Sequence, residues 1–332
     1  MKIPYFDTHC DTISAAMWAG QDIRENNLHV DLKRGSEGFT HWAQVFALWS
    51  RELPPGMTYA DLNYKEPDMP ADTMYEMYLK MLAQAKRGFE ENADLITLCL
   101  SAEDVEATAS AGKSAAFLSI EGAEQIKCDI ALMEQAYADG VRIINPCWNY
   151  DNALTGSCAG AGEHLGLSAQ GRDFAVRAGE LRILLDMSHI SEAGFWDTAE
   201  ICESQGRPLF ASHSDAKALC GHVRNLTDDQ FKAIVRTGGV AGLNFYPDLL
   251  GPHGTVDIDS CVRHVEHFLS LGGERAICVG GDLDGISELP NGMSGIQDVH
   301  LIYDALLARG HSEELVRDIF YNNALECFRR AL

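Results

Sequence analysis

The sequence of 332 residues predicts an α/β protein that folds as one (β/α)8 barrel, also called a TIM barrel. Eight short, near-continuous apolar runs recur along the chain, and helical patterns separate most of them. Strands that alternate with helices indicate a parallel sheet, and eight such strands suit a closed barrel of this length. No Ser/Gly/Pro-rich linker, low-complexity tract or internal repeat divides the chain, so one domain over residues 1–332 is favoured. An open doubly wound sheet with two subdomains is the alternative.

The strands are predicted from apolar runs that lack a polar face, which is typical of strands covered on both sides by helices. These runs lie at residues 3–6, 42–49, 115–120, 141–145, 183–187, 208–211, 239–244 and 276–279.

The helices are predicted from apolar spacing and from N-cap residues such as Ser168, Ser191 and Thr227. They lie at residues 72–92, 129–139, 168–180, 191–205, 227–237, 256–271, 295–309 and 312–330. Residues 51–69, rich in Pro, Tyr and Asp, predict an insertion over one rim of the barrel. Residues 244–255 predict a second rim loop.

Composition limits the partners and the compartment. The formal net charge is −23, from 49 acidic and 26 basic residues, which argues against nucleic acid or an anionic membrane as a partner. The ten cysteines form no Cys-x-x-Cys pair, and several lie in apolar runs, so reduced core cysteines are expected. The N-terminus lacks the pattern of a secretory signal, and no apolar stretch reaches membrane-spanning length. We therefore expect a cytoplasmic protein.

Polar residues that bind metals or move protons follow the predicted strands. His9 and Asp11 follow the first run and share a face, because side chains alternate along an extended chain. The others are Glu121 after residues 115–120, His189 after 183–187, His213 after 208–211 and Asp282 after 276–279. In a parallel barrel the carboxyl ends of the strands surround one cavity. The pattern thus predicts a site where imidazoles and carboxylates bind divalent ions, with Asp282 beside it as an acid or base.

Each of these residues also has a structural explanation. Glu121 can stabilise a helix N-terminus, His189 and His213 can hydrogen-bond to neighbouring serines, and Asp282 with Asp284 can form a turn. Coincidence at five strand ends is improbable, which favours the metal site. A carboxylate between two sets of ligands suggests two metals that share Glu121. Such a pair lowers the pKa of a bridging water and polarises a carbonyl or phosphoryl oxygen, which is the chemistry of hydrolysis.

Six segments in the same order resemble the membrane (renal) dipeptidase family, peptidase family M19, within the amidohydrolase barrels, and the chain is most similar to its bacterial-type soluble members. The segments are Phe6-Asp-Thr-His-Cys-Asp-Thr12, Ser119-Ile-Glu-Gly122, Leu185-Asp-Met-Ser-His-Ile-Ser191, Ala211-Ser-His-Ser214, Val223-Arg-Asn-Leu226 and Gly280-Gly-Asp-Leu-Asp-Gly285.

The resemblance implies a dipeptidase with two Zn²⁺ per chain, for which Mn²⁺ or Co²⁺ could substitute. His9 and Asp11 would bind one zinc, His189 and His213 the other, and Glu121 would bridge them. The bridging hydroxide would attack the peptide bond. Arg224 would bind the carboxylate of the dipeptide, and Asp282 would carry the proton from the attacking water to the leaving nitrogen. A homodimer is also implied.

One position departs from the pattern of the mammalian enzymes. Trp148, with Asn149 beside it, stands where those enzymes have a His that stabilises the oxyanion. Both residues are predicted to contact the substrate. The residue that donates a hydrogen bond to the oxyanion is left unassigned, because an indole N–H donates one hydrogen bond and carries no charge. The lipid-anchor signal of the mammalian enzymes is absent from the C-terminal residues.

Two other functions stay open at this level. Related barrels hydrolyse lactones or phosphotriesters or deaminate their substrates with similar metal ligands. An inactive metal-binding scaffold is the third possibility. The match at Arg224 favours dipeptides, because a guanidinium suits a free carboxylate.

Overall fold

The computed structural model of the chain describes residues 2–49, 71–160, 162 and 164–332. This part of the chain contains nine strands. They are β1 (Tyr5–Cys10), β2 (Trp42–Leu48), β3 (Ile96–Leu98), β4 (Ser114–Glu121), β5 (Val141–Asn145), β6 (Leu184–Leu185), β7 (Phe210–Ala211), β8 (Val240–Leu243) and β9 (Ile277–Val279). Every strand but β3 falls on a predicted apolar run.

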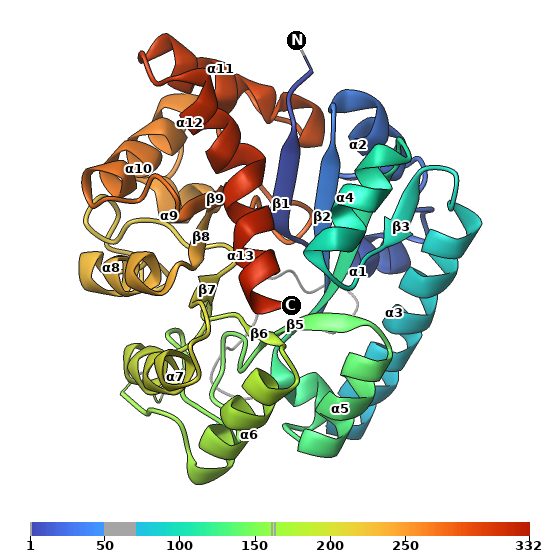
Figure 1. The fold of residues 1–332 in the computed structure, drawn as a ribbon, viewed down its shortest axis with the longest axis vertical. Coiled ribbons are helices and arrows are strands. Elements are labelled where there is room, and N and C mark those ends of the chain that lie inside the picture. The colour runs from blue at the N-terminus through green and yellow to red at the C-terminus, as the bar shows by residue number, and fades with distance from the viewer. Residues whose placement is uncertain (1, 50–70, 161, 163) are drawn as a thin grey trace.

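The strands form a parallel barrel. Their order in the sheet is β6-β5-β4-β2-β1-β9-β8-β7, which follows the chain around a ring. The two ends of this order meet, because Asp186 and Phe210 form an isolated parallel bridge and the Met187 N–H donates to the Phe210 carbonyl at 2.9 Å. Helices surround the ring of strands (Figure 1). The predicted (β/α)8 barrel is confirmed, and the open doubly wound sheet is excluded.

The helices lie between the strands and outside them. They are α1 (Thr12–Ala19), α2 (Leu32–Gly38), α3 (Ala71–Glu91), α4 (Ala102–Ser110), α5 (Ile130–Ala138), α6 (Ala169–Glu180), α7 (Glu192–Ser204), α8 (Asp228–Thr237), α9 (Pro247–Leu250), α10 (Ile258–Ser270), α11 (His300–Ala308), α12 (Glu313–Arg317) and α13 (Asn323–Ala331). The predicted N-caps are confirmed, because Ser168, Ser191 and Thr227 each accept a backbone N–H from the first turn of the following helix.

Several elements were not predicted. The strand β3 has three residues, too few to show a periodicity, and it pairs with β4 outside the closed order. The helices α1, α2 and α4 are short, and α9 is a single turn inside the predicted rim loop. The predicted helix over residues 312–330 is interrupted by a π-helical segment at Asp318–Asn322. The predicted insertion at residues 51–69 lies outside the described residues.

The amino-terminal mouth of the barrel is filled by aromatic side chains. Phe328, from α13, packs at ring-centroid distances of 5.0 Å from Phe6, 4.9 Å from Phe117 and 6.0 Å from Phe210. All four side chains are buried, and α13 lies across the middle of the ring of strands (Figure 1). Such filling makes this end a packed core. The interior of the barrel is therefore closed at this end, and the polar residues that follow the strands lie at the opposite, carboxyl-terminal mouth.

The cysteines fit the expectation of core residues. None of the ten cysteines is in a disulfide, and eight of them are buried. Within the described part of the chain, no helix combines the length and the apolar character that a membrane crossing requires.

Candidate metal centre

The polar residues that follow the predicted strands all lie at the carboxyl-terminal mouth of the barrel. They are His9 in β1, Asp11 directly after it, Glu121 at the end of β4, His189 after β6, His213 after β7 and Asp282 after β9. The strands are parallel, so their carboxyl ends surround the same space although up to 273 positions separate the residues in the chain.

The carboxylate of Glu121 is the centre of this cluster. Its Oε1 atom lies 2.8 Å from His189 Nε2, 3.5 Å from His213 Nε2 and 3.7 Å from His9 Nε2. Asp11 completes the group, with its Oδ2 atom 3.3 Å from His9 Nε2. All five side chains are buried. The structure therefore brings together every residue that was predicted as a metal ligand.

Hydrogen bonds orient the imidazoles of His189 and His213. The Nδ1 atom of His189 lies 2.8 Å from Asn149 Oδ1, and that of His213 lies 2.6 Å from Ser212 Oγ. If both Nδ1 atoms donate, both Nε2 atoms carry lone pairs, and these two atoms are only 3.0 Å apart. Burial lowers the pKa of both imidazoles well below the usual range, which favours the neutral rings. Two lone pairs and the Glu121 carboxylate thus converge on a space that suits a cation.

Negative charge dominates the other half of the cluster. Burial alone would lower the pKa of His9, but the charges of Glu121, Asp11 and Asp282 raise it to about 10. Burial, together with the charges of Asp11 and Asp282, raises the pKa of Glu121 well above its usual range. The Oδ1 atom of Asp11 is buried and has no hydrogen-bond partner among the described residues. A divalent cation would neutralise these acids and give that oxygen a partner.

The spacing of the donor atoms fits two divalent ions. Ligand atoms bound at 2.0–2.2 Å to a tetrahedral ion lie about 3.4 Å from one another. The separations given above run from 2.8 Å to 3.7 Å within the two sets His9–Asp11–Glu121 and Glu121–His189–His213. Each of these two sets can hold one metal ion, and they share Glu121; His9, His213 and Asp282 form a third group of similar spacing. They contain nitrogen and oxygen donors without a thiolate, which suits a catalytic rather than a structural ion.

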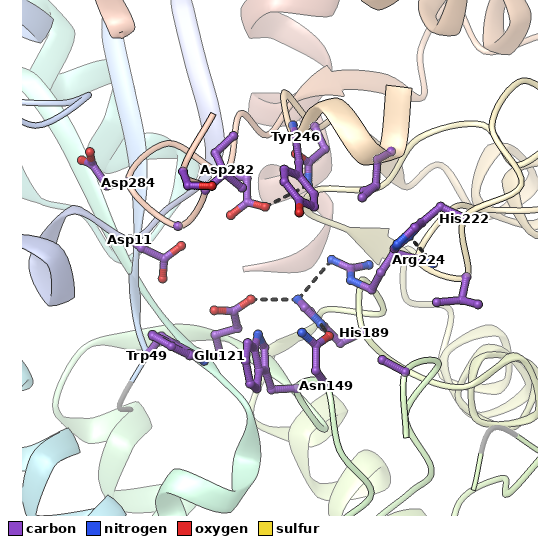
Figure 2. A pocket seen from close by; sticks show the side chains of 18 residues that line it. Asp11, Trp49, Glu121, Asn149, His189, His222, Arg224, Tyr246, Asp282 and Asp284 are labelled. Carbon is purple, nitrogen blue, oxygen red and sulfur yellow. Dashed lines mark hydrogen bonds and ion pairs between the residues drawn. The ribbon is translucent and has the colours of Figure 1, made fainter. Parts of the chain in front are cut away.

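A cavity of about 370 Å³ opens beside the cluster. Figure 2 shows Asp11, Glu121, Arg224 and Asp282 pointing into it from different walls. The lining residues are Asp11, Trp49, Glu121, Trp148, Asn149, Ala159, His189, His222, Val223, Arg224, Asn244, Tyr246, Leu249, Asp282, Asp284, Gly285, Ile286 and Ser287. The volume suits a small molecule rather than a folded partner.

Asp282 is held by an asparagine that was not predicted to take part. The Asn244 amide donates from Nδ2 to Asp282 Oδ2 at 3.0 Å. Its own Oδ1 accepts the Tyr246 N–H at 2.7 Å, which leaves the NH₂ group facing the carboxylate. The other oxygen of Asp282, Oδ1, lies 3.9 Å from His9 Nε2. Burial is the main cause that raises the pKa of Asp282 to about 6. Asn244 follows β8 as the other residues follow their strands, but its residue type gave no signal of metal or proton chemistry.

Arg224 lies in the loop after β7 and reaches the cluster. Its Nη2 atom donates to His189 Nε2 at 3.1 Å and to the His213 carbonyl at 3.4 Å, and Nη1 donates to Ser214 Oγ at 3.5 Å. The guanidinium is buried at one end of the cavity. It is therefore a fixed positive charge beside the Glu121–His189–His213 set.

Trp148 and Asn149 lie next to each other on the cavity wall but have different surroundings. The Trp148 ring packs 4.9 Å from Trp49, 5.7 Å from Tyr150 and 6.2 Å from the His189 ring, measured between centroids. Asn149 contacts the Nδ1 atom of His189 through its Oδ1. Asn149 thus orients a candidate metal ligand as well as lining the cavity.

Comparison with known proteins gives consistent matches. Residues 1–331 match the model of a family described as membrane dipeptidase (peptidase family M19). The chain is 34% identical over 272 residues to an uncharacterized Klebsiella pneumoniae protein from the pqqA 5′ region, covering 79% of this chain and 97% of that protein.

Two solved structures are similar over nearly their whole length. A metallo peptidase from Rhodobacter sphaeroides, liganded with a phosphinate mimic of L-Ala-D-Ala, is 24% identical with a TM-score of 0.88, and all of both chains is covered. The dipeptidase AC, a metallo peptidase of family M19, is 26% identical with a TM-score of 0.86, and 100% of this chain and 99% of that chain are covered.

Proposed function

The chain belongs to the membrane dipeptidase family, peptidase family M19, and from this membership we propose that it is a dinuclear zinc dipeptidase. The observation that carries the proposal is the convergence of His9, Asp11, His189 and His213 on the single carboxylate of Glu121, at the edge of a cavity of small-molecule size. The similarity to dipeptidase AC supports the same reaction class.

Two zinc ions would be held by the two sets of side chains. His9 and Asp11 would hold one ion, His189 and His213 the other, and Glu121 would contact both. Bound divalent ions would lower the pKa of a water molecule and polarise the scissile carbonyl. Mn²⁺ or Co²⁺ would also suit these donors, because imidazole and carboxylate accept several first-row metals.

Arg224 would bind the C-terminal carboxylate of the substrate. The lone pair of His189 Nε2 serves one partner at a time, so a metal ion on that atom would release the Arg224 N–H for the substrate. The guanidinium lies directly beside the His189–His213 set. One residue, about 3.8 Å of chain, would therefore span the distance from a scissile carbonyl at that set to the Arg224 guanidinium. This geometry favours dipeptides over longer peptides.

Asp282 would carry the proton. Its Oδ2 is held by Asn244, while its Oδ1 faces the cluster and lines the cavity. A carboxylate in this position can accept a proton from the attacking water and deliver it to the leaving nitrogen. Trp148 would form the wall beside the scissile bond, and Asn149 would keep His189 in its orientation.

A substrate panel tests this function. Zinc-reconstituted protein should hydrolyse dipeptides with a free amine and a free carboxylate, including L,L and L,D stereoisomers. Tripeptides and C-terminally amidated dipeptides should react much more slowly, because they do not place a carboxylate on Arg224. Faster hydrolysis of a lactone or a phosphotriester, or deamination, would contradict the proposal. Inertness of the metal-loaded protein toward every substrate would point to a scaffold.

Replacement of Arg224 should mainly raise KM. We expect Arg224→Ala to raise the KM for a dipeptide about 10- to 100-fold, since a hydrogen bond to a charged group contributes roughly 1.5–3 kcal/mol. Arg224→Lys keeps the charge without the two-pronged geometry, so its KM should lie in between. The amidated dipeptide is the matched control, because its slow hydrolysis should be unaffected by Arg224→Ala. Equal effects on both substrates in steady-state assays would show that Arg224 does not bind the carboxylate.

A further inference from the structure

Asp186 is a buried carboxylate that belongs to neither set of candidate ligands. It is 1% exposed and lies directly after β6, three residues before His189. Its Oδ1 accepts hydrogen bonds from the Ser188 N–H at 3.0 Å, the Ser188 hydroxyl at 2.6 Å and the Ser212 N–H at 2.9 Å. Its Oδ2 accepts a short hydrogen bond from the Ser212 hydroxyl. Asp186 therefore binds the residues that precede both His189 and His213.

These hydrogen bonds cross the seam at which the barrel closes. The strands β6 and β7 are two residues long, and a single bridge between Asp186 and Phe210 joins them. Little backbone pairing is therefore available to hold the two strand ends in register. Side-chain hydrogen bonds strengthen this pairing. Asp186 accepts from Ser212, and Ser188 Oγ accepts the His213 N–H at 3.1 Å.

The hydrogen bonds also determine the direction of the protons. A carboxylate only accepts, so the Ser212 hydroxyl donates its proton to Asp186 Oδ2. The Ser212 oxygen then offers a lone pair to His213 Nδ1, which lies 2.6 Å away, and the imidazole donates its N–H there. The proton on Nδ1 leaves the lone pair on Nε2, the atom that faces Glu121 and His189.

We propose that Asp186 and Ser212 form a carboxylate–hydroxyl–imidazole relay that fixes the tautomer of His213 and so sets the affinity of the Glu121–His189–His213 site for its metal ion. The inference rests on the proposed function, because it takes His213 as a metal ligand. Both are positioning residues that act through His213. Partners behind a ligating histidine typically change metal affinity 10- to 100-fold. The Nδ1 atom of His189 contacts the neutral amide of Asn149 instead. The negative charge of Asp186 therefore acts on this site through His213.

Substitution of Asp186 by Asn should reverse the relay. The amide oxygen of Asn would still accept hydrogen bonds from the N–H groups of Ser188 and Ser212. Its NH₂ group would face the Ser212 hydroxyl oxygen and donate to it. The Ser212 hydroxyl would then donate to His213 Nδ1, and the ring proton would move to Nε2, where it blocks metal binding. Ser212→Ala, by contrast, leaves Nδ1 without this partner and permits both tautomers. The effect of Asp186→Asn should therefore be the larger one.

The experiment is a zinc titration of the metal-free protein against a competing chelator, with thermal unfolding of each metal-free variant alongside. A His9→Ala variant shows which of the two binding steps belongs to the other site. We expect Asp186→Asn to weaken the step assigned to the Glu121–His189–His213 site about 10- to 100-fold and Ser212→Ala to weaken it less, while the other step keeps its affinity. Ser188→Ala is the matched control, because it removes a bond to the same carboxylate and the bond to the His213 backbone N–H but leaves the contact between Ser212 Oγ and His213 Nδ1 in place.

The outcomes separate the relay from the function on which it rests. If Asp186→Asn and Ser212→Ala bind zinc as Ser188→Ala does, the relay is wrong while a dinuclear site stands. The relay is also wrong if both steps weaken equally in proportion to a lower unfolding temperature, which is a structural effect. If neither the parent protein nor His9→Ala binds zinc, the proposed function fails and the relay with it.

Discussion

The Glu121→Gln variant should lose both metal ions and lower kcat/KM for dipeptides about 10⁴-fold. Among the described residues, Glu121 supplies the carboxylate that the two ligand sets share, and the neutral amide is a poorer ligand without the negative charge. Loss of an indirect partner already costs 10- to 100-fold in affinity, so loss of a shared direct ligand should cost at least that much at each site. Steady-state kinetics and the zinc content per chain, measured on the same preparation, test this prediction.

Glu124→Gln is a matched control for this substitution. Glu124 lies three residues further along, in the 3₁₀ helix Ala123–Ile126 that follows β4, is also buried, and accepts a hydrogen bond from Asn152 at 2.8 Å. Burial raises its pKa to about 7, but it is in neither candidate metal set. This variant should keep its zinc. If Glu121→Gln also kept two zinc ions and hydrolysed dipeptides at the parent rate, Glu121 could not be the shared ligand.

The second large effect is expected for Asp282→Asn, which should lower kcat about 10²- to 10⁴-fold while the zinc content stays the same. The amide oxygen can still accept the N–H of Asn244, so the side chain keeps its place. The NH₂ group, however, cannot accept a proton. Residue 282 has a φ of 56°, a conformation that asparagine adopts readily, so the exchange adds little backbone strain. Pre-steady-state and steady-state rates with a dipeptide measure the effect on the chemical step.

Asp284→Asn separates proton transfer from loop structure. Asp284 also lines the cavity and has a positive φ of 70°, but its carboxylate is used by the Thr12 hydroxyl at 2.6 Å and the His29 N–H at 2.6 Å. Its substitution should reduce stability more than kcat. Equal losses of kcat in both variants, or a parent-like kcat in Asp282→Asn, would argue against a proton-transfer role for Asp282.

The sequence predicted the barrel and its cluster because both follow from one repeated rule. Parallel strands bring their carboxyl ends to one mouth, so the position of His9, Glu121 or His213 after an apolar run locates it in space without knowledge of any contact. Asn244 obeys the same rule, but an asparagine after a strand carries no signal of metal or proton chemistry. It was therefore missed, although it determines how Asp282 is held.

Features that depend on side-chain distances could not be predicted. Asp186 lies inside a predicted strand, and only the structure shows that its carboxylate joins Ser188 and Ser212 across the seam. Short elements such as β3 and α9 contain too few residues for a period to appear. The sequence pattern also did not show the break at Asp318–Asn322 in the predicted C-terminal helix, where Phe320 is buried between Tyr5 of β1 and Tyr303 of α11.

Anomalous diffraction at the zinc absorption edge, from crystals of the zinc-reconstituted protein, tests the central claim most directly. We expect two peaks on opposite sides of the Glu121 carboxylate, one next to His9 and Asp11 and the other next to His189 and His213. A map without a peak beside Glu121, or with zinc bound only at the protein surface, would contradict a dinuclear centre in this barrel.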